Sequence, residues 1–152
     1  MQRLTYPRTI VVRVMPSTRD VLVDFYRSPP RSWKLEQGSK SVFELKFYRG
    51  NWKESPLPSW FAKTTLSSLF AKRRPLKPSR TGASISLESW PAELFVTMKS
   101  KDMTFEISIV YEVAMIDKAE PMSRDDKKKW RAAVDEDCHA LLARLNIMHD
   151  SY

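Results

Sequence analysis

The sequence is short of the residue types from which catalytic centres are usually built. It contains one cysteine, Cys138, and two histidines, His139 and His149. Neither histidine has a partner at the spacing of a metal site or of a cysteine–histidine pair. Only three glycines occur, and none belongs to a glycine-rich phosphate-binding loop. We therefore expect a protein that is not an enzyme and that carries no cofactor or metal.

Long apolar runs are absent as well. No segment approaches the roughly 18 apolar residues that a membrane-spanning helix needs. Arg3, Arg8 and Arg13 interrupt the pattern of a secretory signal peptide. A single cysteine excludes an internal disulfide and fits a reducing compartment. We expect an intracellular protein without a transmembrane segment, peripheral to any membrane that it binds and, if it is viral, on the inner face of the envelope.

Acidic residues are missing from one long stretch of an otherwise mixed sequence. The net charge is +8, yet residues 55–87 contain no Asp or Glu. The six basic residues of this stretch are Lys63, Lys72, Arg73, Arg74, Lys77 and Arg80. Such clustering produces a local positive field that attracts polyanions or an anionic membrane surface. These six residues are our candidates for binding anionic lipid or nucleic acid.

The C-terminal half predicts a hairpin followed by a long helix. Apolar and polar residues alternate in residues 92–99 and 103–117, as in strands with one face on a core. From Ser123 to Leu145 the apolar period becomes three or four residues, with Asn146 expected to end the helix. The predicted apolar stripe consists of Trp130, Val134, Cys138, Leu141, Leu142 and Leu145. We expect this stripe to cover the inner face of the sheet, with Cys138 buried as a structural thiol.

The N-terminal half predicts further strands. Residues 8–15 and 21–25 have the composition of two strands joined by a turn, which indicates a first hairpin. An irregular loop follows over residues 28–39. Residues 41–49 alternate Phe43, Leu45 and Phe47 with polar positions, and the glycine that follows ends this strand.

The middle of the chain predicts one shorter helix and a basic loop. Ser59 is placed to cap a helix over residues 59–71. A basic loop over residues 72–82 and a short strand near residues 85–87 complete the connection to the C-terminal hairpin. The expected fold is a single α+β domain over residues 1–152, in which an antiparallel sheet of about six strands, in one layer or two, packs on the long helix.

Two residue groups have more than one interpretation. Four tryptophans, Trp33, Trp52, Trp60 and Trp90, lie in predicted loops or at element ends, where a ring can stack on a base, sit at a lipid headgroup or plug the core. We take Trp52, Trp60 and Phe61 as candidates for an aromatic part of the binding surface. The acidic clusters at residues 125–126 and 135–137 fit a solvated helical face better than a two-metal site.

Three stretches carry a resemblance to a known family. Val42–Gly50 is similar to an early apolar strand that ends in glycine, Glu93–Val113 to a long central hairpin, and Lys127–Val134 with Ala143–Ile147 to a last helix. In these patterns the chain resembles the matrix proteins of non-segmented negative-strand RNA viruses, with the short bornavirus-type matrix nearest in size. No Pro-Pro-x-Tyr budding motif occurs. The basic run at residues 72–80 has no assignable counterpart, so no family binding residue is transferred.

The resemblance implies a non-enzymatic virion protein. Such a protein would form homo-oligomers, bind anionic membrane lipids, and contact a nucleoprotein and single-stranded RNA. The competing hypothesis is a basic nucleic-acid-binding regulatory module, from a phage or a host, without a membrane role. An enzyme of unknown type is the third. Salt-sensitive lipid binding favours the first hypothesis, and a steep salt dependence with nucleic acid alone favours the second.

Overall fold

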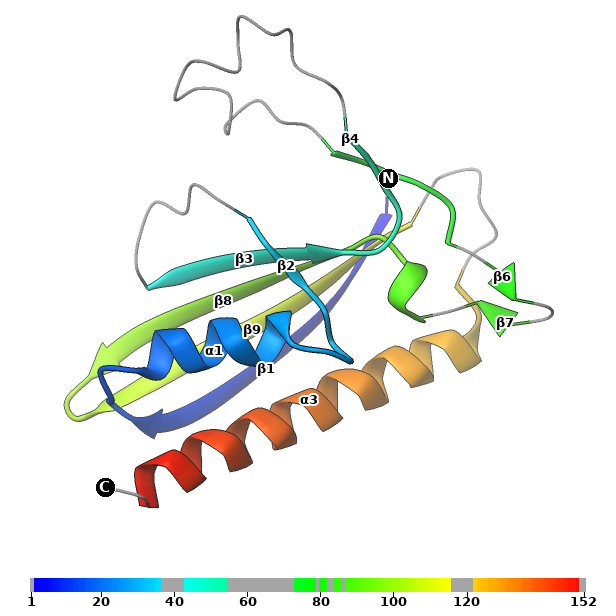
Figure 1. The fold of residues 1–152 in the computed structure, drawn as a ribbon. Coiled ribbons are helices and arrows are strands. Elements are labelled where there is room, and N and C mark those ends of the chain that lie inside the picture. Colours follow the sequence, from blue (N-terminus) through cyan, green and yellow to red (C-terminus); the bar gives the residue numbers. More distant parts are fainter. Residues whose placement is uncertain are drawn as a thin grey trace, which may run out of the picture.

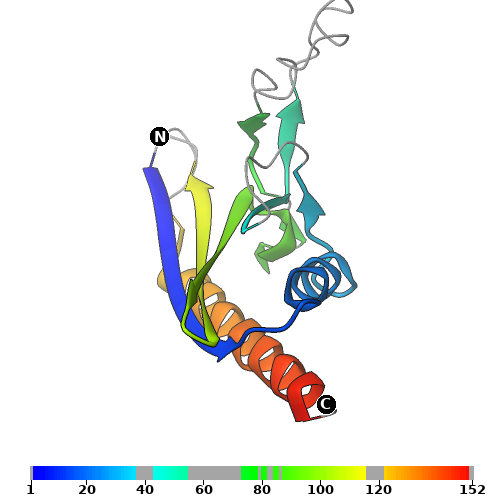
Figure 2. The same ribbon diagram turned by 90° about the vertical axis from the view of Figure 1, so that its left-hand side faces the viewer.

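Five strands of the computed structural model form one antiparallel sheet, and two helices lie beneath the same face of it (Figures 1 and 2). The structure describes residues 2–36, 43–54, 73–78, 80–81, 84–85, 87–115 and 122–150. The strand order is β1 (Gln2–Arg13), β9 (Thr104–Met115), β8 (Ala92–Lys101), β3 (Glu44–Arg49) and β2 (Lys34–Leu35). The predicted α+β class, with an antiparallel sheet on a long C-terminal helix, is confirmed.

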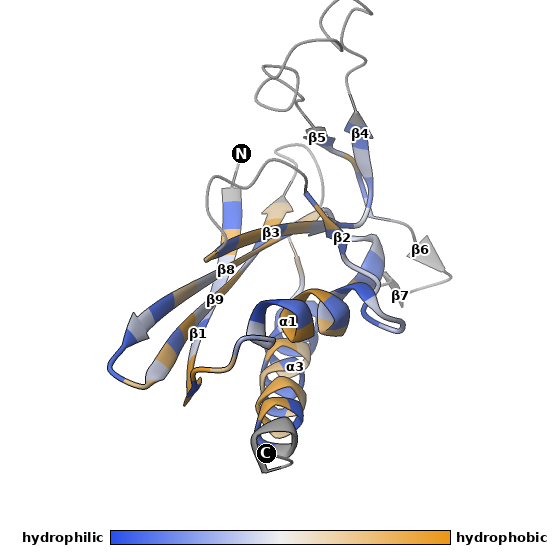
Figure 3. Cartoon of the chain, turned by 60° about the vertical axis from the view of Figure 1, so that its left-hand side comes forward, coloured by the Kyte–Doolittle hydropathy of each residue, from blue (hydrophilic) through white to orange (hydrophobic). Residues whose placement is uncertain are grey.

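The central hairpin follows the predicted alternation. Strands β8 and β9 pair from Ala92↔Val113 to Lys101↔Thr104, and Asp102 in the turn has a positive φ of 55°. The inward positions of both strands are buried and the intervening ones are mostly polar, a pattern visible along both strands in Figure 3. The predicted strands at residues 92–99 and 103–117 are therefore confirmed, except that Met103 belongs to the turn and residues 116–117 lie outside the described residues.

The long helix α3 (Arg124–Asp150) begins where the sequence predicts. The Ser123 hydroxyl accepts a hydrogen bond from the Asp126 N–H at 3.1 Å, which caps the first turn. The predicted stripe is buried at Trp130, Val134, Cys138, Leu141 and Leu145 and half-buried at Leu142. The helix extends past the predicted stop at Asn146 to Asp150, where neither glycine nor proline is present to end it earlier.

The predicted strand at residues 21–25 is also wrong. These residues belong to helix α1 (Thr18–Arg27), and strand β1 pairs with β9 instead of with its sequence neighbour. Val21, Leu22, Phe25 and Tyr26 are all buried, and their spacing places them on one side of a helix. A short apolar run rich in valine fits a buried strand and a helical stripe equally well, and here packing against the sheet selects the helix.

The chain between β3 and β8 contains more strand than predicted. Strand β4 (Trp52–Glu54) pairs with β5 (Arg73–Pro75), and β6 (Arg80–Thr81) pairs with β7 (Ser84–Ile85). The predicted loop over residues 72–82 is thus partly strand. In place of a strand reaching residue 87, β7 ends at Ile85 and a 3-10 turn, η1, spans Leu87–Ser89. The described part contains nine strands rather than about six.

Two other predicted segments are only partly covered. The predicted helix at residues 59–71 lies outside the described residues. Strand β3 begins at Glu44, whereas residues 41–42 of the predicted strand also lie outside them. The predicted irregular loop contains the two-residue strand β2, which pairs with β3 through Lys34↔Tyr48 and Leu35↔Phe47.

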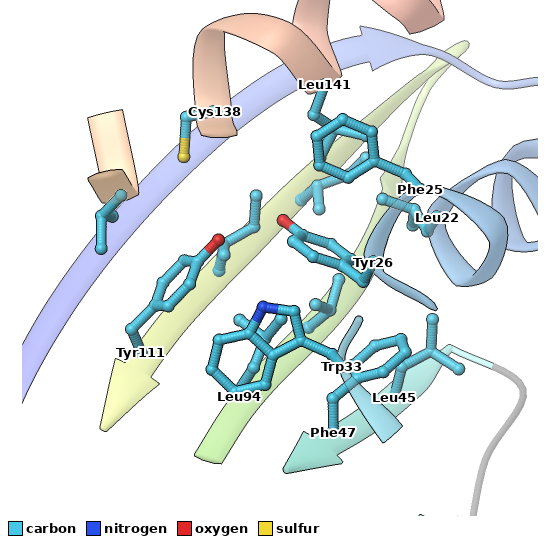
Figure 4. Close-up of a cluster of buried hydrophobic side chains, with 14 of the residues drawn as sticks. Leu22, Phe25, Tyr26, Trp33, Leu45, Phe47, Leu94, Tyr111, Cys138 and Leu141 are labelled. Carbon is cyan, nitrogen blue, oxygen red and sulfur yellow. The ribbon is translucent and has the colours of Figure 1, made fainter. Parts of the chain in front are cut away.

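The core fills the space between the sheet and the two helices (Figure 4). Its largest fully buried side chains include Trp33, Trp130, Tyr26 and Tyr111. The ring of Trp33 lies edge-on to Tyr111 with 5.7 Å between centroids, and the guanidinium of Arg49 lies 4.3 Å from the centroid of the Trp33 ring. Because Trp33 and Trp90 are both buried, they are core residues rather than stacking platforms.

Candidate anion-binding surface

Strands β4 and β5 form a two-stranded ribbon that projects from the end of the main sheet (Figure 1). Three hydrogen bonds fix its base. The indole N–H of Trp52 donates a hydrogen bond to the Arg49 carbonyl at 2.9 Å. The backbone N–H of Leu76 donates to the Asn51 carbonyl at 3.0 Å, and the side-chain amide of Asn51 donates to the Lys77 carbonyl at 2.9 Å. The segment predicted to be an extended basic loop is therefore held at Leu76 and Lys77 against the turn that ends β3.

The ribbon brings two cations directly opposite each other. Lys53 pairs in register with Arg74, and both side chains are exposed. Lys77, also exposed, follows at the end of the ribbon. Like charges at directly opposite positions of an antiparallel pair are destabilising. An anionic ligand would relieve that repulsion, which makes the ribbon a candidate binding surface.

Apolar groups accompany these cations. Leu76 has 42% of its surface exposed and lies between Pro75 and Lys77. Trp52 is half-buried, with its indole N–H already bonded to the Arg49 carbonyl. Cations next to an exposed leucine and a partly exposed indole are the composition of a surface that meets both lipid phosphates and the apolar layer below them.

The structure places the predicted binding residues unequally. Arg74 lies on the ribbon, Lys77 follows two residues after the end of β5, and Trp52 is at the base of the ribbon. Arg73 lies in β5 and Arg80 in β6, but their side chains are outside the description. Lys63, Lys72, Trp60 and Phe61 lie outside the described residues altogether.

Sequence reasoning missed two groups of cations. The first consists of Lys53 alone, which was not named as a binding residue because it precedes the acid-free stretch. Only its strand register places it opposite Arg74 on the ribbon. The second group stands at the start of α3, where all members are exposed: Arg124, Lys127, Lys128, Lys129 and Arg131. The three consecutive lysines were a visible signal in the sequence, but we used them only as part of the stretch Lys127–Val134 that resembles a last helix.

Five cations elsewhere on the described chain form ion pairs, namely Arg3, Arg8, Arg31, Lys46 and Arg144. Arg8 bonds to Asp135 at 2.6 Å, Arg31 to Asp137 at 3.0 Å, and Lys46 to Glu93 at 3.0 Å. Burial lowers the pKa of Lys46, but the hydrogen bonds and charges of Glu93 and Glu36 outweigh it, so the net pKa shift is upward. Within the described chain no ion pair involves the exposed cations of the ribbon or those of the first α3 turns, and the same holds for the exposed cations Arg13, Arg27, Lys34, Lys99 and Lys101.

The acidic helix face is occupied by structural contacts. Asp135 accepts a hydrogen bond from Arg8, which holds the pKa of that carboxyl below its usual value, and Asp137 accepts bonds from Arg31 and from the Tyr111 hydroxyl. Among the described residues no group of three His, Cys, Asp or Glu side chains is arranged to hold a metal ion. Burial raises the pKa of the Cys138 thiol to about 11, so this cysteine is protonated near neutral pH.

Comparison with known protein families, curated proteins and solved structures found no match. In the described part of the chain, no helix combines the length and apolar character needed to cross a membrane.

Proposed function

We propose that this chain is a non-enzymatic, matrix-like structural protein that binds an anionic membrane surface through its ribbon. The observation that carries the proposal is the pair of exposed cations Lys53 and Arg74, with exposed Leu76 and Lys77 following along the chain, none of the three cations having an ion pair within the described residues. The cations at the start of α3 supply further positive charge toward the end of the sheet at which β9 finishes (Figures 1 and 2). The resemblance to viral matrix proteins points the same way.

The magnitudes favour reversible binding. A Lys or Arg close to an anionic leaflet contributes about 1 kcal/mol, and the contribution falls away within a Debye length. Three ribbon cations alone would therefore give weak binding, and burial of Leu76 and Trp52 at the headgroup boundary would add to it. Binding should weaken steeply with salt, because most of the attraction comes from exposed charges.

Binding to nucleic acid is the second candidate. The same exposed cations would contact phosphates, which supports a sequence-independent interaction. Sequence-tolerant binding of single strands also uses aromatic platforms. Trp33, Trp90 and Trp130 are buried and unavailable for stacking, so this candidate ranks below the membrane. Contact with RNA or a nucleoprotein in addition to membrane binding stays a prediction from the resemblance.

Co-sedimentation with vesicles tests the membrane proposal. The ribbon variant carries Lys53→Ser, Arg74→Ser and Lys77→Ser, and the matched control carries Arg27→Ser, Lys99→Ser and Lys101→Ser, which remove the same charge from exposed positions off the ribbon. We expect the wild type and the control to pellet with phosphatidylserine vesicles at low salt, and neither to pellet with neutral vesicles. The ribbon variant should bind at least tenfold more weakly.

Two outcomes contradict the proposal. Equal losses in the ribbon variant and in the control would mean that net charge, not the ribbon, governs binding. The second outcome is a wild type that binds neither vesicle type but slows single-stranded RNA in a native gel, with an affinity that falls steeply with salt. In that case nucleic-acid binding replaces membrane binding as the proposed function.

A further inference from the structure

Strand register places two cationic side chains of the ribbon side by side. Lys53 of β4 lies directly opposite Arg74 of β5. Side chains at directly opposite positions of an antiparallel pair project from the same face, with about 4.5–5.5 Å between their Cβ atoms. The ammonium group of Lys53 and the guanidinium group of Arg74 can therefore contact one small anion together.

Within the described chain no carboxylate neutralises this pair. Both side chains are exposed, and no ion pair of the described residues involves Lys53 or Arg74. The one acidic residue of the ribbon, Glu54, takes the register position opposite Arg73. Like charges at opposite positions repel each other, so the pair favours a ligand that brings more than one negative charge to a single point.

Backbone hydrogen bonds hold the pair in place before any ligand binds. Asn51, two residues before Lys53, accepts a hydrogen bond at its carbonyl from the N–H of Leu76, two residues after Arg74, at 3.0 Å. The N–H of Asn51 donates to the Ser89 carbonyl at 3.0 Å, which ties this end of the ribbon to the segment before β8. A site that is formed in advance loses little backbone entropy when a ligand binds.

The chemistry of the two cations suits a terminal phosphate. Arginine presents a planar fork of donors that binds two phosphate oxygens at once, and lysine binds phosphate as a compact point charge. A phosphomonoester has three acceptor oxygens and carries about −1.5 to −2 charges at pH 7. A phosphodiester carries a single negative charge on each phosphate, so it neutralises only one member of the pair.

We propose that the ribbon selects a lipid whose headgroup is a phosphomonoester, such as phosphatidic acid, over lipids with phosphodiester headgroups. Lys53 and Arg74 bind the same phosphate from the two strands, while the exposed Leu76 meets the apolar layer below the headgroups. This inference rests on the proposed function, because it names the headgroup that the same surface binds.

Co-sedimentation with two kinds of vesicle tests the selection. One kind contains phosphatidic acid and the other phosphatidylserine, and their mole fractions are adjusted until the two zeta potentials are equal. Matched potentials remove the effect of overall charge, so any remaining difference reports the headgroup. We expect the full chain to bind the phosphatidic acid vesicles about fivefold more tightly, the effect of one further charge at the membrane surface.

Three variants at exposed positions assign the selection to the register pair. Lys53→Ser breaks the pair and should bind both kinds of vesicle equally. Lys77→Ser, the matched control, removes a cation outside the pair; it should weaken binding to both and keep the fivefold ratio. Arg74→Lys keeps the charge but loses the fork, so it should lower the ratio and leave phosphatidylserine binding unchanged. Equal ratios in Lys53→Ser and Lys77→Ser would overturn the assignment.

A soluble competitor distinguishes a lipid from a free phosphomonoester. Glycerol 3-phosphate presents the same phosphate without an apolar layer, and at the concentration of the accessible phosphatidic acid it should not displace the protein from vesicles. Displacement would overturn the lipid as the source of the phosphate. Equal binding of the wild type to the two matched vesicles would overturn the selection and leave the proposed function in place. Failure to bind either kind would overturn both.

Discussion

At the scale of single residues, Trp130 joins the long helix to the sheet. Its ring is 1% exposed and stacks on Tyr6 of β1, with 6.4 Å between centroids and 13° between the ring planes. The guanidinium of Arg49 lies 5.8 Å from the centroid of the same ring. One α3 side chain thus contacts both the first strand and the end of the third.

Trp130→Ala should lower the free energy of unfolding by about 3–5 kcal/mol, the range for truncating a large aromatic residue in a core. Urea unfolding followed by far-UV circular dichroism measures this change. Val11→Ala, at an exposed position on β1, is the control and should change stability by less than about 0.5 kcal/mol. A Trp130→Ala midpoint equal to that of the wild type would mean that α3 does not pack on this sheet.

At the scale of elements, Gly50 allows the ribbon to leave the sheet. It has a φ of +97°, and a Cβ atom at this position would lie 2.0 Å from the backbone carbonyl oxygen of Trp90. The next residue is tied to the same region, because the Asn51 N–H donates to the Ser89 carbonyl at 3.0 Å. The position therefore requires glycine both for its backbone angle and for the close approach of another chain segment.

Gly50→Ala should destabilise the fold by at least about 2 kcal/mol, since backbone strain and a clash with main-chain atoms add. Gly50→Asn separates the two causes, because asparagine tolerates a positive φ but still carries a Cβ. If the clash dominates, both variants lose similar stability in thermal unfolding. If Asn is tolerated, the backbone angle is the main constraint, and the close approach to Trp90 is relieved by a small shift.

At the scale of the whole molecule, the two faces of the main sheet differ. Both described helices cover one face (Figure 1). The other face carries ion pairs: one carboxylate oxygen of Glu93 lies 3.5 Å from a guanidinium nitrogen of Arg3, and the other lies 3.0 Å from Nζ of Lys46. The edge strand β1 is protected at its centre. Pro7 lacks an N–H, and the Arg8 guanidinium donates to the Pro7 carbonyl at 2.7 Å while bonding to Asp135. Proline and charge at an edge oppose pairing with a second sheet.

Self-association, which the resemblance implies, should therefore not use the edge of β1. The double variant Pro7→Val, Arg8→Ala restores an N–H donor and uncovers a carbonyl acceptor on this edge. We expect its weight-average sedimentation coefficient to rise more steeply with concentration than that of the wild type, as strand edges pair. Thr5→Val, at an exposed position on the same strand, is the control. Matching curves for the double variant and the wild type would show that these two residues do not guard the edge.

The sequence by itself determined the strands and the helix whose pattern of apolar and polar residues extends over many positions. The alternation in β9 and the helical stripe of α3 extend over many residues, and a long pattern distinguishes a period of two from one of 3.6. The same local logic predicted the burial of Cys138 and the end of β3 at Gly50. The acid-free stretch also directed attention to Arg74 and Lys77, which are exposed on the ribbon and two residues past its end.

Only the tertiary structure decided the remaining features, because they depend on partners distant in the sequence. The short apolar run at residues 21–25 fits a strand or a helix, and its packing beneath the sheet selects the helix. Strand β1 finds its partner in β9, with Tyr6 opposite Tyr111, across most of the chain. Lys53 joins Arg74 only through strand register. Local periodicity records which face of an element is apolar, whereas the identity of the element that covers that face is set by packing.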